Sequence, residues 1–299
     1  MNQPKIGIIY LTYATQKWER DIVNAMTSLE KISYPKDSIE LICVESKSNR
    51  EPVKPWFERE WMPKSNQNLP SITYLDFTNE SLGFAANNNR GLAKAKELGC
   101  DYVYLLNQDA DVAPNFLEPI VARMEGDKSI GIAQSLILLG EDRDRVNTVG
   151  NAYHFLGFGY SRGYKWTTEQ ARAFYKEERL TNPDLEIAYT SGAGMMVRVA
   201  ALEDRPLFDE DFFMYHEDTE ASFMMRIQGK KIVVVPESVI YHWYEFSNSM
   251  TKFFWMERNR YAVMFMYLKP WTLFLISPFL IGMEFVLCLF SLARGWWPE

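Results

Sequence analysis

The sequence predicts an α/β protein with a parallel, doubly wound sheet and membrane-associated helices at its C-terminal end. Short β-rich runs alternate with stretches of helical periodicity over residues 6–106, which is typical of parallel sheets. The chain has 299 residues, and 47% of them are hydrophobic, which is enough for a sizeable core. Residues 270–299 differ from the rest in being strongly apolar and aromatic, and they predict the C-terminal helices.

The predicted elements of the first third follow one another in a regular order. Strands are expected at 6–11, 39–44, 72–77 and 101–106, and helices at 18–29 and 84–98. Gly99 closes the second helix, where glycine is a common C-cap. Four prolines and little periodicity at 52–70 indicate a loop or a broken helix.

The middle of the chain shows a less regular pattern. Residues 140–180 are charged, aromatic and dotted with glycine, and we expect mostly long loops there, which are often functional. The other expected elements are a helix at 115–124 after Pro114, a turn and strand at 188–199, a helix at 219–227 and strands at 231–235 and 239–242.

Composition and charge exclude some classes of protein. The net charge is −7 and the pI is about 5.3, which argues against nucleic acid as the main partner. The three cysteines are scattered without a CxxC pair, as expected in a reducing compartment without a disulfide framework. The opening residues MNQPKIGIIY lack the features of a signal peptide.

The apolar C-terminal segment is interrupted by Pro278 and Glu284. A membrane span needs about 20 apolar residues, and an ionised carboxylate at mid-depth costs about 2.5–3.5 kcal/mol on insertion scales. We therefore expect two helical segments lying in the membrane interface. Core helices or a dimer interface are the alternative, so formation of a homo-oligomer stays open. Three tryptophans suit the depth of lipid headgroups: Trp271, Trp296 and Trp297.

Two aspartates, Asp109 and Asp111, follow the apolar strand at 101–106. Ligands in doubly wound sheets bind beyond the carboxyl ends of the strands. An Asp-x-Asp sequence there is either a solvated turn or a site for Mg²⁺ or Mn²⁺. Such a metal would neutralise the charge that builds on a diphosphate leaving group.

Seven segments, taken in order, carry a resemblance to a known family. They are IGIIYLTYATQ (6–16), ICVESKSN (42–49), NESLGFAANNNRGLAKA (79–95), LLNQDADV (105–112), TSGAGMMVR (190–198), LFDEDFFMYHEDTEASFMMRIQGKKIVVVPESVIYH (207–242) and ERNR (257–260). In this order the chain resembles the family 2 inverting glycosyltransferases of the Rossmann-like GT-A fold. It looks most like the branch with bacterial rhamnosyltransferases and other cell-surface polysaccharide enzymes.

The resemblance implies a nucleotide-sugar site. Glu45 and Asn49 depart from the family pattern, which usually has Asp at both positions, and this leaves the base of the nucleotide open. Asn89, with its neighbours, either bonds the donor or caps the helix, and Arg90 either lies near the pyrophosphate or forms a structural salt bridge. Arg258 either clamps the diphosphate or is a surface charge. The expected nucleotide-sugar residues are Leu11, Thr12, Tyr13, Glu45, Gly83, Phe84, Asn89, Arg90, Asp109 and Arg258.

The metal ligands implied by the resemblance are Asp109, Asp111 and His242, with Mn²⁺ or Mg²⁺ as the cofactor. Asp111 is the firmer ligand, whereas Asp109 acts through the ribose or a metal-bound water. His242 is either a structural histidine or completes the metal shell, because neutral imidazole ligates Mn²⁺.

The catalytic base implied by the resemblance is Asp218, with Glu217 orienting it or the acceptor. An inverting transfer needs a base within hydrogen-bond reach of the acceptor hydroxyl. The first turn of a helix favours the ionised carboxylate, and N-capping by Asp218 is the structural alternative. The turn with Gly192, Ala193 and Gly194 is expected on the acceptor side.

The resemblance implies an inverting, metal-dependent glycosyltransferase that uses a nucleotide-sugar donor and a lipid-linked or polysaccharide acceptor. The donor is expected to be dTDP-rhamnose or, second, a UDP-sugar such as UDP-GlcNAc, UDP-galactose or UDP-galactofuranose. We expect residues 1–112 to bind the nucleotide sugar, 113–250 the acceptor, and 251–299 a membrane surface. The expected location is the cytoplasmic face of the cell membrane, as a peripheral or monotopic protein.

Two other functions were weighed. A nucleotidyltransferase would need a glycine-rich basic loop near the N-terminus, which this sequence lacks. A non-catalytic nucleotide-binding scaffold would have lost the acidic motifs, and both are present at 109–111 and 217–218.

Overall fold

The structure is a computed structural model that describes residues 3–243 and 249–296, so Trp297 lies outside the described part. The strands are β1 (Ile6–Thr12), β2 (Ile39–Ser46), β3 (Ser71–Phe77), β4 (Tyr102–Leu106), β5 (Ala110–Val112), β6 (Ile130–Leu139), β7 (Val146–Thr148), β8 (Asn151–Tyr153), β9 (Gly159–Ser161), β10 (Gly194–Arg198) and β11 (Lys231–His242). The α-helices are α1 (Trp18–Leu29), α2 (Lys54–Glu60), α3 (Phe84–Glu97), α4 (Leu117–Gly126), α5 (Thr168–Glu178), α6 (Glu217–Ile227), α7 (Met250–Tyr267) and α8 (Pro270–Ala293).

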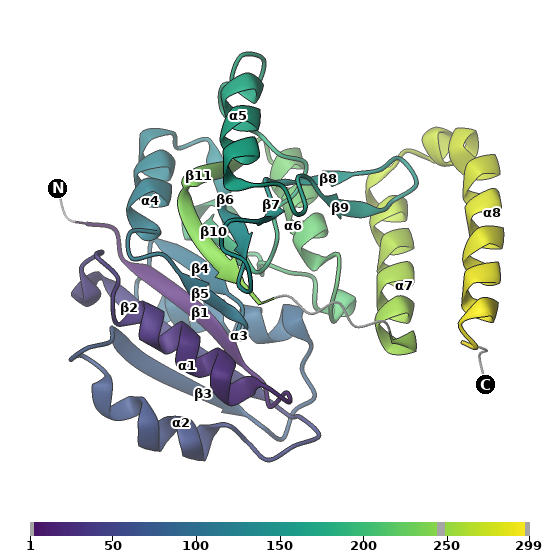
Figure 1. Ribbon diagram of the computed structural model, residues 1–299. Coiled ribbons are helices and arrows are strands. Elements are labelled where there is room, and N and C mark those ends of the chain that lie inside the picture. Colours follow the sequence, from purple (N-terminus) through teal and green to yellow (C-terminus); the bar gives the residue numbers. More distant parts are fainter. Residues whose placement is uncertain (1–2, 244–248, 297–299) are drawn as a thin grey trace.

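One mixed sheet forms the body of the molecule (Figure 1). Its strand order is β3-β2-β1-β4-β10-β6-β11-β5, with β7 paired to β6. The strands β3, β2, β1 and β4 are parallel, as predicted. The prediction of an all-parallel sheet was too simple, because β10 runs antiparallel between β4 and β6 and β5 runs antiparallel to β11. The α/β fold class itself is confirmed.

Helices cover both faces of the sheet, which explains the apolar character of its strands. Side chains alternate between the faces, so Ile8 and Tyr10 of β1 pack with α1, α2 and α4, whereas Ile9 packs with α3. The first two predicted helices agree with α1 and α3, and Gly99 follows α3 with φ of 72°, the left-handed conformation expected of a C-cap.

The region 140–180 contains more structure than the sequence indicated. It holds β7, the hairpin of β8 and β9, and α5, a helix whose N-terminus has a complete capping box between Thr167 and Gln170. The prediction of mostly long loops was wrong because these strands are only three residues long and lack a periodic pattern. The sequence prediction also omitted β6, and it divided β11, which is continuous despite a register shift between Val235 and Val239.

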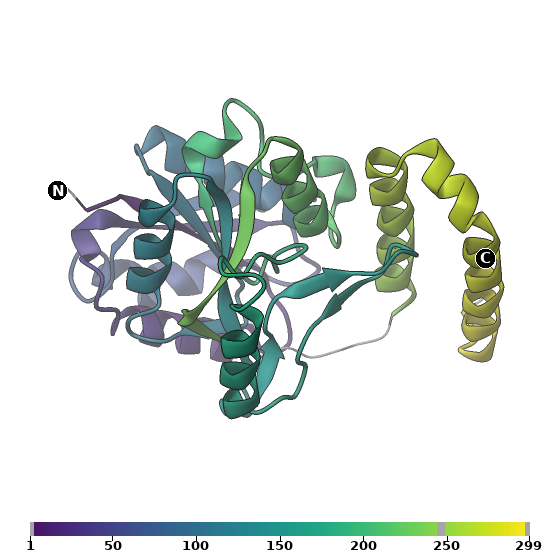
Figure 2. The same ribbon diagram turned by 90° about the horizontal axis from the view of Figure 1, so that it is seen from above.

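The C-terminal helices α7 and α8 stand beside the sheet, and the β8–β9 hairpin reaches toward α7 (Figure 2). The expectation of two apolar segments was wrong, because α8 is one helix of 24 residues that contains Pro278. Its first turns run at an angle to the rest in both views, as a proline inside a helix permits. Glu284 does not break α8, since glutamate is a good helix former, and its charge is paired at 2.6 Å with Arg260 of α7.

Among the described residues, α8 is the one helix long and apolar enough to cross a membrane. The mean hydropathy of its most apolar window is 2.3, and all of its residues lie at the surface or are only partly covered. A helix that is hydrophobic all round needs an apolar partner. The helix is therefore suited to a membrane, which agrees in outline with the prediction.

Candidate active site

Asp218 lies in the first turn of α6, next to the turn that precedes β10. Its Oδ2 accepts a hydrogen bond from the Gly192 N–H at 3.2 Å, and its Oδ1 accepts one from the Thr219 N–H at 2.7 Å. The fold thus brings together two segments that the sequence named separately, the predicted base and the predicted acceptor-side turn. Ala193 is buried in this turn, and Gly194 begins β10.

A cavity of about 720 Å³ opens in front of Asp218. Glu217, Asp218 and Thr219 line one part of it, and His242 lines another. The remaining lining residues come from the 147–164 region, the segment around Tyr189, the loop before α6 and α7: Asn147, Asn151, Gly159, Ser161, Tyr164, Tyr189, Ser191, Tyr215, His216 and Met256. The cavity is therefore large enough for a sugar unit and joins the predicted base to a predicted metal ligand.

The two carboxylates at the start of α6 have unusual protonation. Burial, with a smaller contribution from the charge of Asp218, raises the pKa of Glu217 well above its ordinary value. Burial also raises the pKa of Asp218, and the N–H groups of Gly192 and Thr219 only partly oppose this. The helix N-terminus was expected to keep Asp218 ionised, but desolvation outweighs it. Both carboxyl groups therefore hold a proton more readily than an exposed carboxylate does.

Of the predicted metal ligands, Asp109 directly precedes β5, Asp111 lies in β5, and His242 ends β11. These two strands pair antiparallel, with Tyr241 opposite Asp111 and His242 opposite Ala110. Asp109 Oδ1 lies 3.1 Å from His242 Nε2. Asp111 is 3% exposed, and its two oxygens accept hydrogen bonds from Trp243 Nε1 at 2.7 Å and from Arg143 at 2.5 Å.

The two aspartates differ in charge environment. Burial alone would raise the pKa of Asp109, but the neighbouring His242 lowers it below its ordinary value. Burial raises the pKa of Asp111, because Trp243 and Arg143 offset the desolvation only in part. The Arg143 guanidinium thus bonds a buried carboxylate whose negative charge is stabilised by a neighbouring cation.

No three His, Cys, Asp or Glu side chains within residues 3–243 and 249–296 converge closely enough to form a metal centre as they stand. The donor set nevertheless suits a hard divalent ion, since it offers two carboxylates and an imidazole. Arg143, whose side chain is 53% exposed, occupies the place of a cation at Asp111 and can move aside. Residues Asp109, Asp111 and His242 therefore fit a metal by their chemistry, although they do not converge on one point as they stand.

The predicted donor residues on β1 and β2 lie at the carboxyl ends of these strands. Glu45 is 1% exposed and accepts hydrogen bonds from the N–H groups of Val53 and Lys54 and from the Tyr74 hydroxyl. Thr12 Oγ1 also contacts the Tyr74 hydroxyl, at 2.9 Å. Glu45 therefore holds the start of α2 against the sheet. Leu11 is partly buried and Tyr13 is 46% exposed.

The start of α3 contacts the loop that leads to Asp218. A Cβ at Gly83 would lie 2.2 Å from the Phe213 carbonyl oxygen, so only glycine allows this approach. Phe84 packs on Phe208, and its ring would be 3.1 Å from a Cβ at Gly192. These residues join the donor side to the acceptor side.

Asn89 and Arg90 contact the segment before α6. The Asn89 side chain donates to the Phe208 carbonyl and to Glu210, and accepts from the N–H groups of Leu207 and Phe208. Arg90 lies 3.9 Å from Glu210. Both side chains thus have structural partners, which was the alternative left open for them.

Arg258 lies apart from the residues above. It stands over the Trp255 ring at 5.0 Å and lines a cavity of about 500 Å³ between α7 and α8. In this arrangement, Arg258 is not brought beside Asp109 or Asp111, and its predicted contact with a diphosphate stays a prediction.

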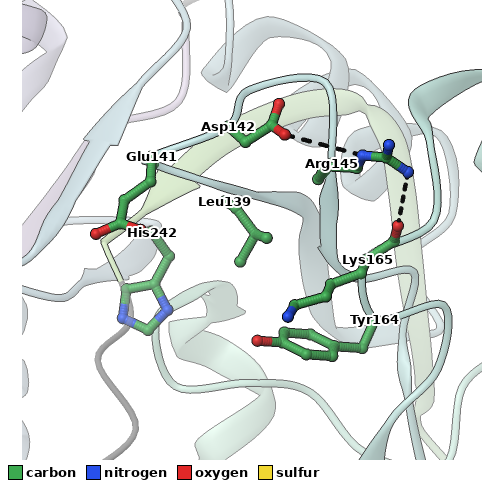
Figure 3. A pocket seen from close by; sticks show the side chains of 8 residues that line it. Leu139, Glu141, Asp142, Arg145, Tyr164, Lys165 and His242 are labelled. Atoms are coloured by element: carbon green, nitrogen blue, oxygen red, sulfur yellow. Dashed lines mark hydrogen bonds and ion pairs between the residues drawn. The ribbon is translucent and has the colours of Figure 1, made fainter.

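A second cavity, of about 490 Å³, adjoins the first (Figure 3). The two cavities share Tyr164 and His242. Figure 3 shows Tyr164 and Lys165 on one side of this cavity and His242 across from them, with Arg145 bonded to Asp142 and to the Lys165 carbonyl. His242 therefore lies between the two cavities and lines both of them.

Three residues that contact the site were not predicted from the sequence. Arg143 and Trp243 bond Asp111, and Asn259 of α7 bonds the loop before α6. Arg143 lies in a loop without a motif, and its contact with Asp111 spans 32 residues, so no sequence signal pointed to it. Trp243 follows His242 directly, and Asn259 follows Arg258 within the ERNR segment. The signal that could have found Trp243 and Asn259 is their position next to the predicted site residues His242 and Arg258.

Comparisons with known proteins found a matching family model and two curated relatives. A family model described as glycosyltransferase like family 2 matches residues 10–262. The N-acetylglucosaminyl-diphospho-decaprenol L-rhamnosyltransferase of Mycobacterium tuberculosis (strain H37Rv) is 25% identical over 191 residues, and its counterpart in strain CDC 1551 matches equally well. The match covers 59% of this chain and 60% of those relatives, so the chain spans less than two thirds of their length.

Solved structures share the fold. GalNAc-T7 with UDP, GalNAc and Mn²⁺ matches with a TM-score of 0.65 and 17% identity, covering 90% of this chain and 49% of that chain. The mannosyltransferase PcManGT from Pyrobaculum calidifontis, with GDP-Man and Mn²⁺, gives 0.56 and 14%, covering 91% and 67%. TarS 1–349 of S. aureus with UDP-GlcNAc gives 0.54 and 18%, covering 87% and 64%.

Proposed function

We propose that this chain, which belongs to the glycosyltransferase-like family 2, transfers a sugar from a nucleotide diphosphate to an acceptor hydroxyl with inversion at the anomeric carbon. The observation that carries the proposal is the cavity that Asp218 and His242 line together. A base for the acceptor and a ligand near the donor diphosphate have to meet at one cavity for a single displacement to occur.

In the proposed reaction, Asp218 accepts the proton of the attacking hydroxyl. The acceptor oxygen forms a bond to the anomeric carbon, and the bond from this carbon to the diphosphate oxygen breaks with its electron pair on the diphosphate. The N–H groups of Gly192 and Thr219 orient the Asp218 carboxylate. Burial raises the pKa of Glu217 and so favours its protonated form, which is able to donate a hydrogen bond to the acceptor.

We propose Asp109, Asp111 and His242 as the residues that hold Mn²⁺ or Mg²⁺. A bound divalent ion supplies positive charge that stabilises the leaving diphosphate. The support is the buried carboxylate of Asp111 with a guanidinium on it and the 3.1 Å contact between Asp109 and His242. Arg143 neutralises Asp111 in the structure, and its charge would be available to the diphosphate if an ion took its place at that carboxylate.

For the substrates, we propose dTDP-rhamnose as the donor and a lipid-linked saccharide as the acceptor. The support is the similarity to an L-rhamnosyltransferase whose name gives N-acetylglucosaminyl-diphospho-decaprenol as its substrate. A UDP-sugar is the second candidate for the donor. The remaining donor residues, from Leu11 to Arg90, belong to the proposal as predicted.

We propose the same division of the chain as above, with 1–112 for the donor, 113–250 for the acceptor and 251–299 for the cytoplasmic face of the membrane. The apolar surface of α8 supports the last part. Deleting residues 270–299 should release the protein from liposomes of mixed anionic lipids in a flotation assay. Continued flotation of the shortened chain would contradict the assignment.

The experiment that tests the function is thermal unfolding with UDP, dTDP, GDP and CDP, each with and without Mn²⁺. A ligand at 100 times its dissociation constant adds about 2.7 kcal/mol to the free energy of unfolding. We expect a Mn²⁺-dependent rise in Tm with dTDP or UDP, followed by transfer in an assay with the matching sugar nucleotide. A folded protein that responds to none of the four would contradict the proposal and favour a scaffold.

A further inference from the structure

The loop that leads into α6 has an unfavourable backbone conformation. Phe213, Tyr215 and His216 all have positive φ, at 59°, 68° and 66°. Side chains with a Cβ rarely adopt this left-handed region, and a loop with three such residues in four positions does not hold its shape by local preference. Asp218 comes two residues after the last of them, so its position depends on what holds the loop.

One side chain from a distant helix holds this loop. Asn259 of α7 is 0% exposed, and its Nδ2 donates to the carbonyl oxygens of Phe212 at 2.7 Å, Met214 at 2.8 Å and Tyr215 at 2.8 Å. An amide NH₂ carries two hydrogens, so they are shared among three acceptors. The three carbonyls therefore converge on one point because Asn259 is there.

The helix that carries Asn259 is itself firmly placed. Its neighbour Arg260 has a side chain that is 1% exposed and pairs at 2.6 Å with both Glu257 and Glu284. Arg260 also donates to the Leu156 carbonyl at the tip of the β8–β9 hairpin, at 2.8 Å. The helix α7 is thus tied to α8 and to the hairpin, and Asn259 presents its amide from a rigid element.

We propose that Asn259 is a positioning residue for the catalytic base: its amide fixes the strained loop before α6 and thereby the place of Asp218 in the cavity. This inference rests on the proposed function only in naming Asp218 as the base. The hold of Asn259 on the loop is a separate claim that exchange measurements test without any substrate.

The surroundings of Asp218 also depend on the loop that Asn259 bonds. The groups that face it are Glu217 on its own helix, Tyr189 from the segment before β10, the N–H groups of Gly192 and Thr219, and His242 across the cavity. If the loop relaxes, water enters and the desolvation of Asp218 lessens. Its pKa should then move down, toward the ordinary value for aspartate.

The test compares Asn259→Ala and Asn259→Asp with a control, Asn182→Ala, in the full chain. Asn182 also bridges a loop with a left-handed residue, since it bonds the Glu186 backbone at 2.8 and 2.9 Å beside Leu185, whose φ is 52°. Asn182 lies outside the cavities described above. Asn259→Asp keeps the volume and opens no cavity, but its carboxylate does not donate to the three carbonyls, so it separates the loss of the hydrogen bonds from the loss of packing.

Two readouts decide the matter. Hydrogen exchange of residues 212–218 should become at least about tenfold faster in both Asn259 variants and stay unchanged in Asn182→Ala, while the sheet keeps its protection. In transfer assays, kcat should fall about 10²-fold with the KM for the donor nearly unchanged, and the acid limb of the kcat profile should move to lower pH.

The inference is overturned if folded Asn259 variants show exchange in 212–218 like that of the wild type. It is also overturned if kcat stays within about threefold of the wild-type value and the acid limb of its pH profile stays within about 0.3 pH unit. A loss of kcat in Asn182→Ala equal to that in the Asn259 variants would overturn it as well. A wild-type protein that exchanges normally but transfers no sugar would instead refute the proposed function. The exchange data would then still show whether Asn259 holds the loop.

Discussion

Two buried carboxylates, Glu45 on the donor side and Glu217 on the acceptor side, have opposite surroundings. On the donor side, Glu45 accepts three hydrogen bonds, from two backbone N–H groups and a tyrosine hydroxyl. Asn89 donates to the carbonyl oxygen of Phe208 and accepts from the N–H groups of Leu207 and Phe208. On the acceptor side, Glu217 is 6% exposed, and its Oε2 has no hydrogen-bond partner in the described part of the chain.

The difference separates residues that hold the fold from residues that are kept for chemistry. A buried carboxylate surrounded by donors stabilises the elements around it. A buried carboxylate that lacks partners costs stability and persists only where the surrounding structure forces it. By this comparison, Glu45 supports the architecture, whereas Glu217 has the surroundings of a residue kept for chemistry, next to Asp218, the base that we propose.

The largest effect is expected from Asp218→Asn. The amide keeps the shape of the side chain but accepts no proton, so kcat should fall by about 10²–10⁴-fold. Binding of the nucleoside diphosphate should remain, as measured by the shift in Tm. Asp204→Asn, an exposed aspartate away from the cavity, is the matched control. Transfer at nearly the normal rate in Asp218→Asn would remove the base from this residue.

The next largest effect is expected on metal and nucleotide binding, from changes at Asp111 of β5 and at its partner Arg143. Asp111→Ala should weaken Mn²⁺-dependent binding of UDP or dTDP by about 10–100-fold, because a ligand with a buried charge is lost. Arg143→Ala should tighten Mn²⁺ binding in the absence of nucleotide, since the competing guanidinium is removed. Isothermal titration with Mn²⁺ alone and with nucleotide measures both. Unchanged affinity in both variants would place the metal elsewhere.

The same substitution in both regions is the sharpest test of the comparison. Glu45→Gln turns an NH₂ group toward donors and should lower the free energy of unfolding by about 1–3 kcal/mol, although burial raises the pKa of Glu45 as well. Glu217→Gln should stabilise the protein while lowering activity. Urea unfolding of both variants measures the difference. Two changes of the same sign would break the comparison.

The sign of the Glu217 effect depends on pH. Its pKa in the folded state is raised above its ordinary value of 4.5, so the folded protein holds more protons and loses stability as the pH rises above that value. Gln does not titrate, so the advantage of Glu217→Gln should be small below pH 4.5 and grow above it, by at most about 1.4 kcal/mol per pH unit. Unfolding curves at pH 4, 6 and 8 check this.

The smallest expected effect is on the pH dependence of the wild type. Burial raises the pKa of Asp218 to about 6, and a base works only when it is deprotonated. The kcat at saturating donor should therefore fall about tenfold per pH unit below pH 6 and level off above it. A rate that is flat between pH 5 and 7 would contradict the raised pKa.

Much of the fold followed from local patterns. The alternation of strands and helices placed β1 to β4 with α1 and α3, because each of these elements is long enough to show its own periodicity. The hairpin of β8 and β9 was missed because its strands have only three residues each, and α5 was missed because most of its 11 residues are polar or charged. The antiparallel direction of β10 was not expected, because direction depends on which strands become neighbours.

The sequence by itself determined the family resemblance and the two acidic motifs, at 109–111 and 217–218, because these depend on residue types at fixed spacing along the chain. Only the tertiary structure decided that Arg143 sits on Asp111 and that Asn259 bonds the loop before Asp218. It also decided that burial raises the pKa of Asp218. The physical reason is that hydrogen bonds and desolvation depend on groups that are distant in sequence, and no local pattern records which of them meet.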